Sequence, residues 1–422
     1  MVVIAMPQNF LSLECVEIRD VDIGERSILA HGYVGEKMEK CPICGGENLK
    51  KGRRASKYHD VPMGLKTVQV NIVRTKYTCL DCGWKYIADH TNEFDEKRKC
   101  TIRLVETIKK RCLAIPFGDL ADYTGLDIAT IKSIAFEYTK EIEDTVKFET
   151  PKVMAINKLM IADQTRYVIS NVEKGSLFNV LDAKLDSTLK NYLKKLPARK
   201  EVKWVFEDLR IPLRELLYDS FPSCKAVVHQ KKVEELLYEC LAKECYLRQI
   251  ILDSKQKGLT EKIVKILTVK KKSNLTASDK KDLAELAKTC PALASCFNYK
   301  EDFLAIYGMR NQTSAKFAMG LWCETIPQEL ALITHFSQIV RNSLIEIMAY
   351  WEVPKSIKQA YLDCYDGLRE ICSYVGNTNN YRIVRARLLY DEDARQSNMI
   401  ESVVGGTLEY GASIQKLRER IS

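Results

Sequence analysis

Two closely spaced pairs of cysteines constrain the fold of this chain more than any other feature. Cys41 and Cys44 lie in the run C-P-I-C-G, and Cys79 and Cys82 lie in the run C-L-D-C-G. Each C-x-x-C run forms a tight turn that directs two thiolates to one point, and two such turns complete the tetrahedral four-sulfur shell of a structural zinc. Two unrelated cysteine pairs in a reducing compartment are the alternative. The spacing favours a zinc ribbon in which a β-hairpin connects the pairs.

The segment that carries these cysteines is strongly basic. From Cys41 to Lys85 it holds nine Lys and Arg residues and three acidic residues, so its net charge is 9 − 3 = +6, whereas the whole chain carries +9. Such a concentration of positive charge attracts polyanions. An ordinary solvated basic face is the alternative, but on a zinc ribbon the charge favours double-stranded DNA. The candidate DNA-binding residues are Lys50, Lys51, Arg53, Arg54, Lys57, Arg74 and Lys76.

The composition of the whole chain is that of a globular protein with several domains. It has 422 residues, of which 46% are hydrophobic and 29% charged, and this length suffices for two or three domains. The remaining cysteines, 15 − 4 = 11, are scattered, which favours reduced thiols. No apolar run predicts a signal peptide or a membrane span. We therefore expect a cytoplasmic, nucleoid-associated protein without a membrane partner.

Helical patterns begin after residue 96. The amphipathic run Thr101–Cys112 is followed by a second helical run from Phe117 and a third over about Ile128–Glu141. Gly125 suits the sharp turn between the last two, and Asp127 can cap the third helix. This pattern is typical of a helix-turn-helix, although a plain helical hairpin also fits it. The third helix would enter the major groove of DNA, and its candidate contact residues are Thr130, Lys132 and Ser133.

From residue 151 the pattern becomes that of an α/β domain. Strands are predicted at 153–156, 166–171, 176–181, 202–206 and 226–229, and helices at 186–196 and 211–219. This order of elements is that of a ribonuclease-H-like domain, in which about 230–350 form an all-helical insertion. The predicted fold class is multidomain α+β. It comprises an N-terminal leader at 1–40, the zinc ribbon at 41–95, the helix-turn-helix domain at 96–150 and the ribonuclease-H-like domain at 151–422.

Six short runs, together with this order of domains, resemble one known family. The runs are Cys41-Pro-Ile-Cys-Gly, His59-Asp-Val-Pro-Met-Gly, Tyr77-Thr-Cys-Leu-Asp-Cys-Gly, Val205-Phe-Glu-Asp-Leu, Phe221-Pro-Ser-Cys-Lys-Ala-Val-Val and Tyr381-Arg-Ile-Val-Arg-Ala-Arg-Leu-Leu. They resemble the insertion-sequence transposases of the ISL-three family, and the resemblance extends from about Cys41 to the C-terminus. It implies a homodimer that cuts and joins DNA ends with three carboxylates and two magnesium or manganese ions.

The catalytic acids of that family are only partly retained. Its second aspartate matches Asp208, but its first falls on Asn157, which is followed by Lys158. The third acid falls on Asp363 in the alignment that we prefer, and on Glu401 in an alternative one. Asn157 offers a neutral amide oxygen and Lys158 adds a positive charge, so both changes disfavour a dication.

The run after the last predicted strand also departs from the family. His229-Gln-Lys-Lys232 stands where the family has an acidic and aromatic run. Asp208 taken alone could be an ordinary helix cap, and Asp163 is considered as a substitute for the lost carboxylate. The favoured hypothesis is a transposase-derived DNA-binding protein with impaired or lost strand transfer. An active transposase that uses Asp208, Asp363 and an amide ligand is the second hypothesis, and a zinc-stabilised protein-interaction scaffold is the third.

Overall fold

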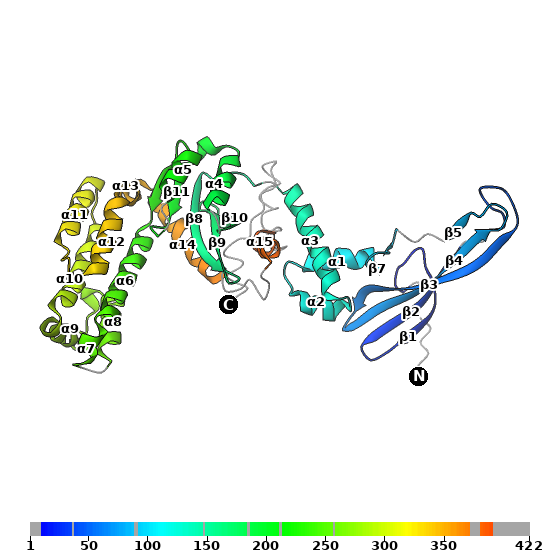
Figure 1. Cartoon of the computed structure of the whole chain (residues 1–422), viewed down its shortest axis with the longest axis horizontal. Coiled ribbons are helices and arrows are strands. Elements are labelled where there is room, and N and C mark those ends of the chain that lie inside the picture. Colours follow the sequence, from blue (N-terminus) through cyan, green and yellow to red (C-terminus); the bar gives the residue numbers. More distant parts are fainter. Residues whose placement is uncertain are drawn as a thin grey trace. The chain divides into compact units, whose positions relative to one another are not determined.

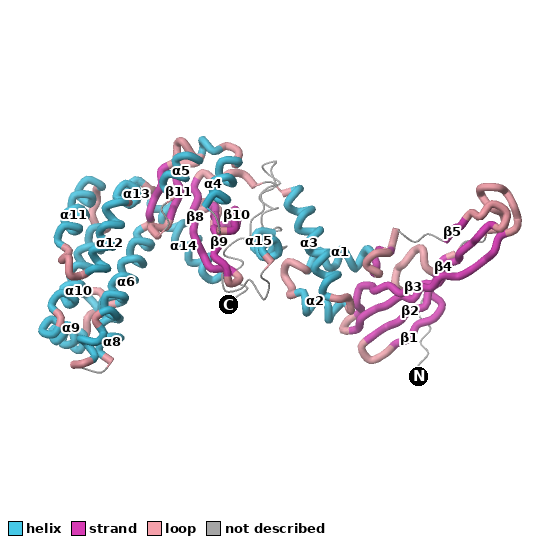
Figure 2. The backbone as a smooth tube through the Cα atoms, viewed as in Figure 1, coloured by secondary structure: helices cyan, strands magenta, loops and turns pink. Residues whose placement is uncertain are grey.

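A computed structural model describes residues 10–35, 38–87, 92–146, 148–183, 186–210, 213–255, 258–371 and 380–390. The chain divides into two compact units, which we call the N-terminal unit (Met1–Lys147 with Gly376–Tyr410) and the central unit (Phe148–Val375 with Gly411–Ser422). The predicted fold class is confirmed. The N-terminal unit contains a sheet, and the central unit contains a second sheet and many helices (Figures 1 and 2). The cysteine cluster lies in the N-terminal unit.

The N-terminal sheet is built around one long antiparallel hairpin, β3–β4. Its strands are β1 (Glu17–Ile23), β2 (Ser27–Val34), β3 (Leu49–Met63), β4 (Lys66–Cys79), β5 (Lys85–Ile87), β6 (Phe94–Asp95) and β7 (Cys100–Thr101). They lie in the order β1-β2-β4-β3-β7-β6, and β5 pairs with β4. Alternate side chains of β4 face the core, since Val68, Val70 and Ile72 are fully buried. β2 pairs with β4 only as far as Arg74, so the far end of the hairpin extends past it (Figure 1).

Three helices follow this sheet: α1 (Ile102–Arg111), α2 (Phe117–Thr124) and α3 (Ile128–Thr145). α2 ends at Gly125, which has a left-handed φ of 74° that a side chain rarely adopts. The side chain of Asp127 caps α3 by accepting the Thr130 amide at 2.8 Å. α1 is anchored to β3, since the buried carboxylate of Asp60 accepts hydrogen bonds from Thr101 and Arg103, both at 2.7 Å.

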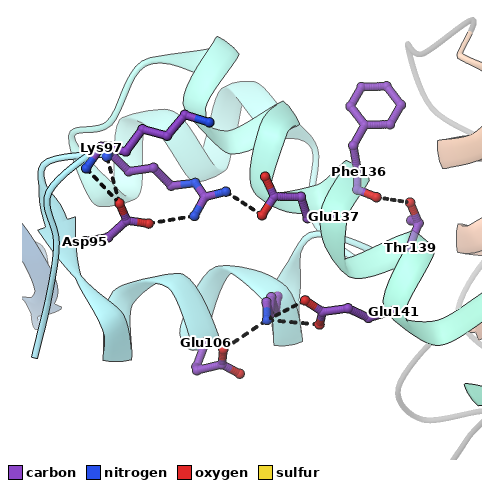
Figure 3. Close-up of polar contacts among 9 residues, drawn as sticks. Asp95, Lys97, Glu106, Phe136, Glu137, Thr139 and Glu141 are labelled. Atoms are coloured by element: carbon purple, nitrogen blue, oxygen red, sulfur yellow. Dashed lines mark hydrogen bonds and ion pairs between the residues drawn. The ribbon is translucent and has the colours of Figure 1, made fainter. Parts of the chain in front are cut away.

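Ion pairs hold α3 against α1 and the β6–β7 turn (Figure 3). Lys109 of α1 pairs with Glu141 of α3 at 3.0 Å and with Glu106 of its own helix at 3.1 Å. Arg98 bridges Asp95 and Glu137, and the Asp95 carboxylate also accepts the backbone amides of the turn. These ion pairs involve Glu137 and Glu141, in the second half of α3. They fix the position of the helix without covering the side chains of its first turn.

A C-terminal helix, α15 (Tyr381–Tyr390), completes the N-terminal unit. Arg385 pairs with Glu143 of α3. The Arg387 guanidinium donates to the carbonyl oxygens of Cys112 and Ile115, at 3.4 and 3.0 Å, beyond the end of α1. This late segment of the sequence therefore packs on helices near the start of the chain.

The central sheet consists of β8 (Val153–Ile161), β9 (Gln164–Asn171), β10 (Ser176–Asp182), β11 (Trp204–Glu207) and β12 (Lys225–Val228). Its order is β10-β9-β8-β11-β12, with β8, β11 and β12 parallel and β8, β9 and β10 antiparallel. α4 (Asp186–Lys195) and α5 (Arg214–Ser220) pack on one face through Leu189, Leu193 and Leu217. α14 (Lys355–Ile371) packs on the other face through Tyr361 and Tyr365.

A helical insertion with its own apolar core separates β12 from α14 (Figure 1). It comprises α6 (Gln230–Leu247), α7 (Gln249–Asp253), α8 (Leu259–Val269), α9 (Ala277–Thr289), α10 (Pro291–Ile306), α11 (Gln312–Thr325), α12 (Ala331–Asn342) and α13 (Leu344–Met348). Short 3-10 turns lie at Arg199–Glu201, Lys272–Asn274 and Ala349–Glu352. Within the described ranges, every helix is too short or too polar to cross a membrane.

Candidate functional site

The four predicted cysteines lie together at the far end of the β3–β4 hairpin. Their sulfur atoms are all within 4.8 Å of one another, with Cys41 Sγ 3.7 Å from Cys82 Sγ and Cys44 Sγ 3.6 Å from Cys79 Sγ. Four thiolates at about 2.3 Å from a tetrahedral zinc lie roughly 3.8 Å apart, so the arrangement fits that ion. Among the described residues, this is the group of His, Cys, Asp or Glu side chains that could hold a metal.

The turns that carry the sulfur atoms are alike. In each, the amide of the glycine after the second cysteine donates to the carbonyl of the first: Gly45 to Cys41 at 2.9 Å and Gly83 to Cys79 at 3.0 Å. Both glycines have positive φ, 71° and 76°. A side chain at either position would strain the turn, which explains why the C-x-x-C-G pattern repeats.

The basic residues of the hairpin divide between its two faces. Along β3, Lys51, Arg53 and Lys57 are exposed on one face, which we call the basic ribbon face, and Lys50 and Arg54 are exposed on the other. The half-buried Lys76 of β4 lies on the second face, opposite Gly52. Within the described part of the chain, none of these six side chains forms an ion pair, so their charge is available to a partner.

Arg74 differs from the other predicted DNA contacts. Its guanidinium is buried and pairs with Glu96 at 2.5 Å. Because this charge is already neutralised inside the unit, we do not include Arg74 in the DNA-binding surface that we propose below.

The start of α3 carries the other predicted contact residues. Lys132 and Ser133 are exposed, as are Ile128 and Ala129 before them. Thr130 is half-buried, and its hydroxyl donates to Asp127 at 2.7 Å, so part of its hydrogen-bonding capacity serves the helix cap. The opposite side of α3 is apolar, with Ile131 fully buried.

In the central unit, three side chains form a row where the parallel strands end at their carboxyl side. The registers of β8 with β11 and of β11 with β12, continued by one or two residues, place Asn157, Asp208 and His229 side by side. All three are buried, on the sheet face that α14 covers. We call them the carboxyl-end row. The structure therefore brings Asn157 and Asp208 together at the positions that the family resemblance assigns to its first two acids.

A buried lysine, Lys232, contacts the carboxylate of this row. The Lys232 ammonium lies 3.0 Å from Asp208 Oδ2 and 2.7 Å from the Tyr365 hydroxyl, to which it donates, and Glu235 Oε2 is 3.8 Å away. Lys232 is only 3% exposed and also stacks over the Tyr365 ring. A buried ammonium thus sits against the retained carboxylate and neutralises it.

The remaining oxygen of Asp208 has a structural role as well. Asp208 Oδ1 accepts the backbone amide of Arg210 at 3.1 Å, which is the capping function expected of an acid at a strand end. The Arg210 guanidinium lies 3.7 Å from Asp208 Oδ2. Asp208 is therefore surrounded by donors and positive charge from its own unit.

Beside the row, the Glu235 carboxylate accepts a hydrogen bond from the Tyr365 hydroxyl at 3.1 Å and is shared with Lys232. Three further acids, Glu207, Asp163 and Asp363, do not replace the missing carboxylate. Glu207 points to the opposite sheet face, where burial, with a contribution from Glu346, raises its pKa to about 8. Asp163 is exposed in the turn between β8 and β9. Asp363 is exposed on α14 and accepts a hydrogen bond from Gln359 at 2.9 Å. It lies two residues from both Tyr361 and Tyr365, and hence on the far side of the helix from the row. Glu401 is outside the described residues.

Lys158 also has a different role from the one predicted. It follows Asn157 along β8 and so faces the other side of the sheet, where its ammonium stacks over the Tyr167 ring and lies 4.0 Å from Asp186. Lys232, rather than Lys158, is the cation that meets the row. The sequence shows the basic run at 229–232, but it does not show that Lys232 meets Asp208 and Tyr365. Tyr365 lies 133 positions from Lys232, and such a contact depends on the fold.

The carboxyl-end row does not fit a two-metal centre. Each magnesium ion is bound through one or two carboxylates, and a two-metal centre must hold both ions, but this row offers one carboxylate, already paired with Lys232, beside a neutral amide and an imidazole. The Nδ2 donor of Asn157 has no acceptor among the described residues. Within those residues, no metal-capable cluster of His, Cys, Asp and Glu includes Asp208.

One comparison with protein families finds a match in the central unit. Residues 156–364 match the family model described as transposase, that of the ISL-three type of DDE transposases. The match covers about half of the chain and runs from β8 to α14, so it includes the carboxyl-end row and the helical insertion. No curated protein matches the chain. From the family match and the cysteine cluster together, the chain belongs to the ISL-three family of transposases.

Proposed function

We propose that this family member is a DNA-binding protein in which metal-dependent strand transfer is impaired or lost. The observation that carries the proposal is the buried ion pair of Lys232 with Asp208, beside the neutral Asn157. A two-metal mechanism needs carboxylates that hold the ions against the attacking and leaving oxygens. Here the ammonium satisfies the retained carboxylate and repels a dication.

DNA binding would use the N-terminal unit. We propose that Cys41, Cys44, Cys79 and Cys82 hold a structural zinc, which fixes the end of the basic hairpin. α2 and α3 would act as a helix-turn-helix, with Lys132 and Ser133 at the exposed start of α3. The protein would act as a homodimer on double-stranded DNA in the cytoplasm, associated with the nucleoid. Support comes from the sulfur geometry, the unpaired basic residues and the transposase family match.

The basic ribbon face gives the first test. Replacing Lys51, Arg53 and Lys57 with Gln should weaken binding to duplex DNA and make the slope of log K against log salt shallower by about 2 to 3, because each lost phosphate contact removes roughly 0.9 from the slope. The matched control replaces Lys262, Lys265 and Lys288, which are exposed lysines of the helical insertion, with Gln. Equal slopes for both triple variants would refute the assignment of this face.

Strand transfer gives the second test. We expect no nicked or joined product when the protein is incubated with labelled DNA that carries its own terminal sequences and magnesium or manganese. Asn157→Asp alone should not restore activity, because Lys232 still neutralises Asp208. Product that disappears in Asp208→Ala would overturn the proposal, as would two manganese ions bound beside Asp208 in a crystal.

The second candidate function is an active transposase. It is favoured by one observation, the retention of Asp208 at a strand end in the row that the family uses for catalysis. Losing one charged ligand from a two-metal site would cost several kcal/mol of transition-state stabilisation, and each 1.36 kcal/mol corresponds to about tenfold in rate. The strand-transfer experiment above distinguishes the two candidates.

A further inference from the structure

A basic cavity opens beside the carboxyl-end row, at the start of α6 and of α14. Its volume is about 310 Å³, and it is lined by His229, Lys231, Glu234, Tyr350, Lys355 and Lys358, among others. Three lysines and one glutamate give its ionisable lining a charge of 3 − 1 = +2 with a neutral His229. The cavity is therefore positive in a fold whose family implies a negative, metal-binding centre nearby.

The three lysines of this cavity are not neutralised within the protein. In the described part of the chain, Lys231, Lys355 and Lys358 form no ion pair, and the ammonium of Lys358 lies 3.9 Å from the centre of the Tyr350 ring. Burial lowers the pKa of Lys358, which shows that this ammonium has lost part of its hydration without gaining a counter-charge. Glu234 accepts a hydrogen bond from Gln230 at 2.6 Å, so that acid is engaged by a neutral amide.

His229 lies at the wall of the cavity. Its Nδ1 accepts the backbone amide of Lys231 at 3.1 Å, so in the neutral ring the proton is on Nε2. Burial, followed by the charges of Lys358 and Lys231, lowers the pKa of His229 to about 4, which keeps the ring neutral at pH 7. The Nε2 donor has no acceptor among the described residues. The N-terminal end of the 18-residue helix α6 adds positive potential at the same place.

We propose that this cavity binds a phosphate group of the DNA backbone. The inference rests on the proposed DNA-binding function and extends it to the central unit. Several converging ammonium groups and a helix N-terminus are the features that bind phosphate oxygens. The cavity is at the small end of the range for ligand sites, which suits a single phosphate group rather than a large organic ligand.

The test compares the full chain with the double variant Lys355→Gln/Lys358→Gln. Loss of the one phosphate contact in the cavity should make the slope of log K against log salt for duplex DNA shallower by about 1. The matched control, Lys262→Gln/Lys265→Gln, removes two exposed lysines of the same unit and should leave the slope unchanged. Lys355→Arg/Lys358→Arg keeps the charge and should retain the slope. Circular dichroism and the thermal unfolding midpoint establish that each variant is folded.

A second measurement separates the DNA backbone from free phosphate compounds. Inorganic phosphate, compared with chloride at equal ionic strength, should raise the unfolding midpoint of the wild-type chain but not that of Lys355→Gln/Lys358→Gln. An unchanged DNA slope in that variant would overturn the backbone assignment. If the DNA slope is unchanged but phosphate stabilises the wild type and not the variant, the cavity binds free phosphate compounds. If phosphate stabilises neither the wild type nor the variant, the cavity binds no anion.

The two proposals fail in distinguishable ways. If wild-type protein does not bind duplex DNA at all, the proposed function fails and the backbone assignment fails with it. If DNA binding depends on the basic ribbon face but not on Lys355 and Lys358, only the inference about the cavity is wrong.

Discussion

Lys232→Ala should destabilise the central unit by about 3 to 5 kcal/mol, which is a large part of the stability of a typical domain. The Lys232 and Asp208 side chains are 2% and 8% exposed, so removing the ammonium takes away the closer counter-charge of a buried carboxylate and leaves the Arg210 guanidinium 3.7 Å from Asp208 Oδ2. Urea unfolding followed by tryptophan fluorescence measures the loss. Three of the four tryptophans, Trp204, Trp322 and Trp351, lie in the central unit and report on it.

Lys243→Ala is the matched control for this experiment. Lys243 lies on the same helix and pairs with Glu239, but the two side chains are 61% and 39% exposed, so its loss should have little effect on stability. The double variant Asp208→Asn/Lys232→Met should cost less than the sum of its single changes, because no charge is then left buried. Equal stability of Lys232→Ala and the wild type would show that the ammonium is not bound in the row.

Cys79→Ser should abolish metal binding at the ribbon and unfold the end of the hairpin. Cys79 is almost fully buried, its sulfur is 3.6 Å from that of Cys44, and a hydroxyl cannot replace the thiolate as a zinc ligand. The free energy of zinc binding in such sites is about 10 to 16 kcal/mol and is coupled to folding. The zinc content measured by elemental analysis should fall from one ion per chain to almost none. DNA binding should weaken because the hairpin that carries the basic ribbon face is no longer fixed at its end.

Cys100→Ser serves as the control for the ribbon. Cys100 is fully buried in β7 of the same unit but is not one of the clustered cysteines, so this variant should keep its zinc. Treatment of the wild type with a strong chelator should reproduce the effect of Cys79→Ser on DNA binding. A Cys79→Ser protein with an undiminished zinc content would contradict the assignment of the site.

Features encoded by neighbouring residues could be predicted from the sequence. The four zinc-type cysteines follow from C-x-x-C-G, since each turn is closed within five residues, and the start of α3 follows from Gly125 and Asp127. The strands of the central sheet were recognisable because apolar runs alternate with turn residues. β8 and β9 are nonetheless longer than predicted, since strand pairing extends them past their apolar parts.

Features that depend on distant residues could not be predicted in this way. Arg74 is basic and lies in a basic strand, and only its pairing with Glu96 shows that its charge is used internally. The position of Asp363 on the exposed side of α14 depends on which side of that helix meets the sheet. The pairing of Lys232 with Asp208 required the start of α6 to lie against the end of β11, and periodicity along the chain does not specify that.

The packing of α15 has a consequence for how the protein is made. Arg385 pairs with Glu143 across 242 positions, so the segment Phe148–Val375 of the central unit is inserted between two segments of the N-terminal one. On the ribosome, the amino-terminal portion emerges early but lacks its closing helix until nearly all of the polypeptide has been translated. A truncated chain that ends before α15 would therefore contain the four clustered cysteines and α3, but the apolar surface that α15 covers would be exposed. Quality-control proteases readily degrade chains of this kind.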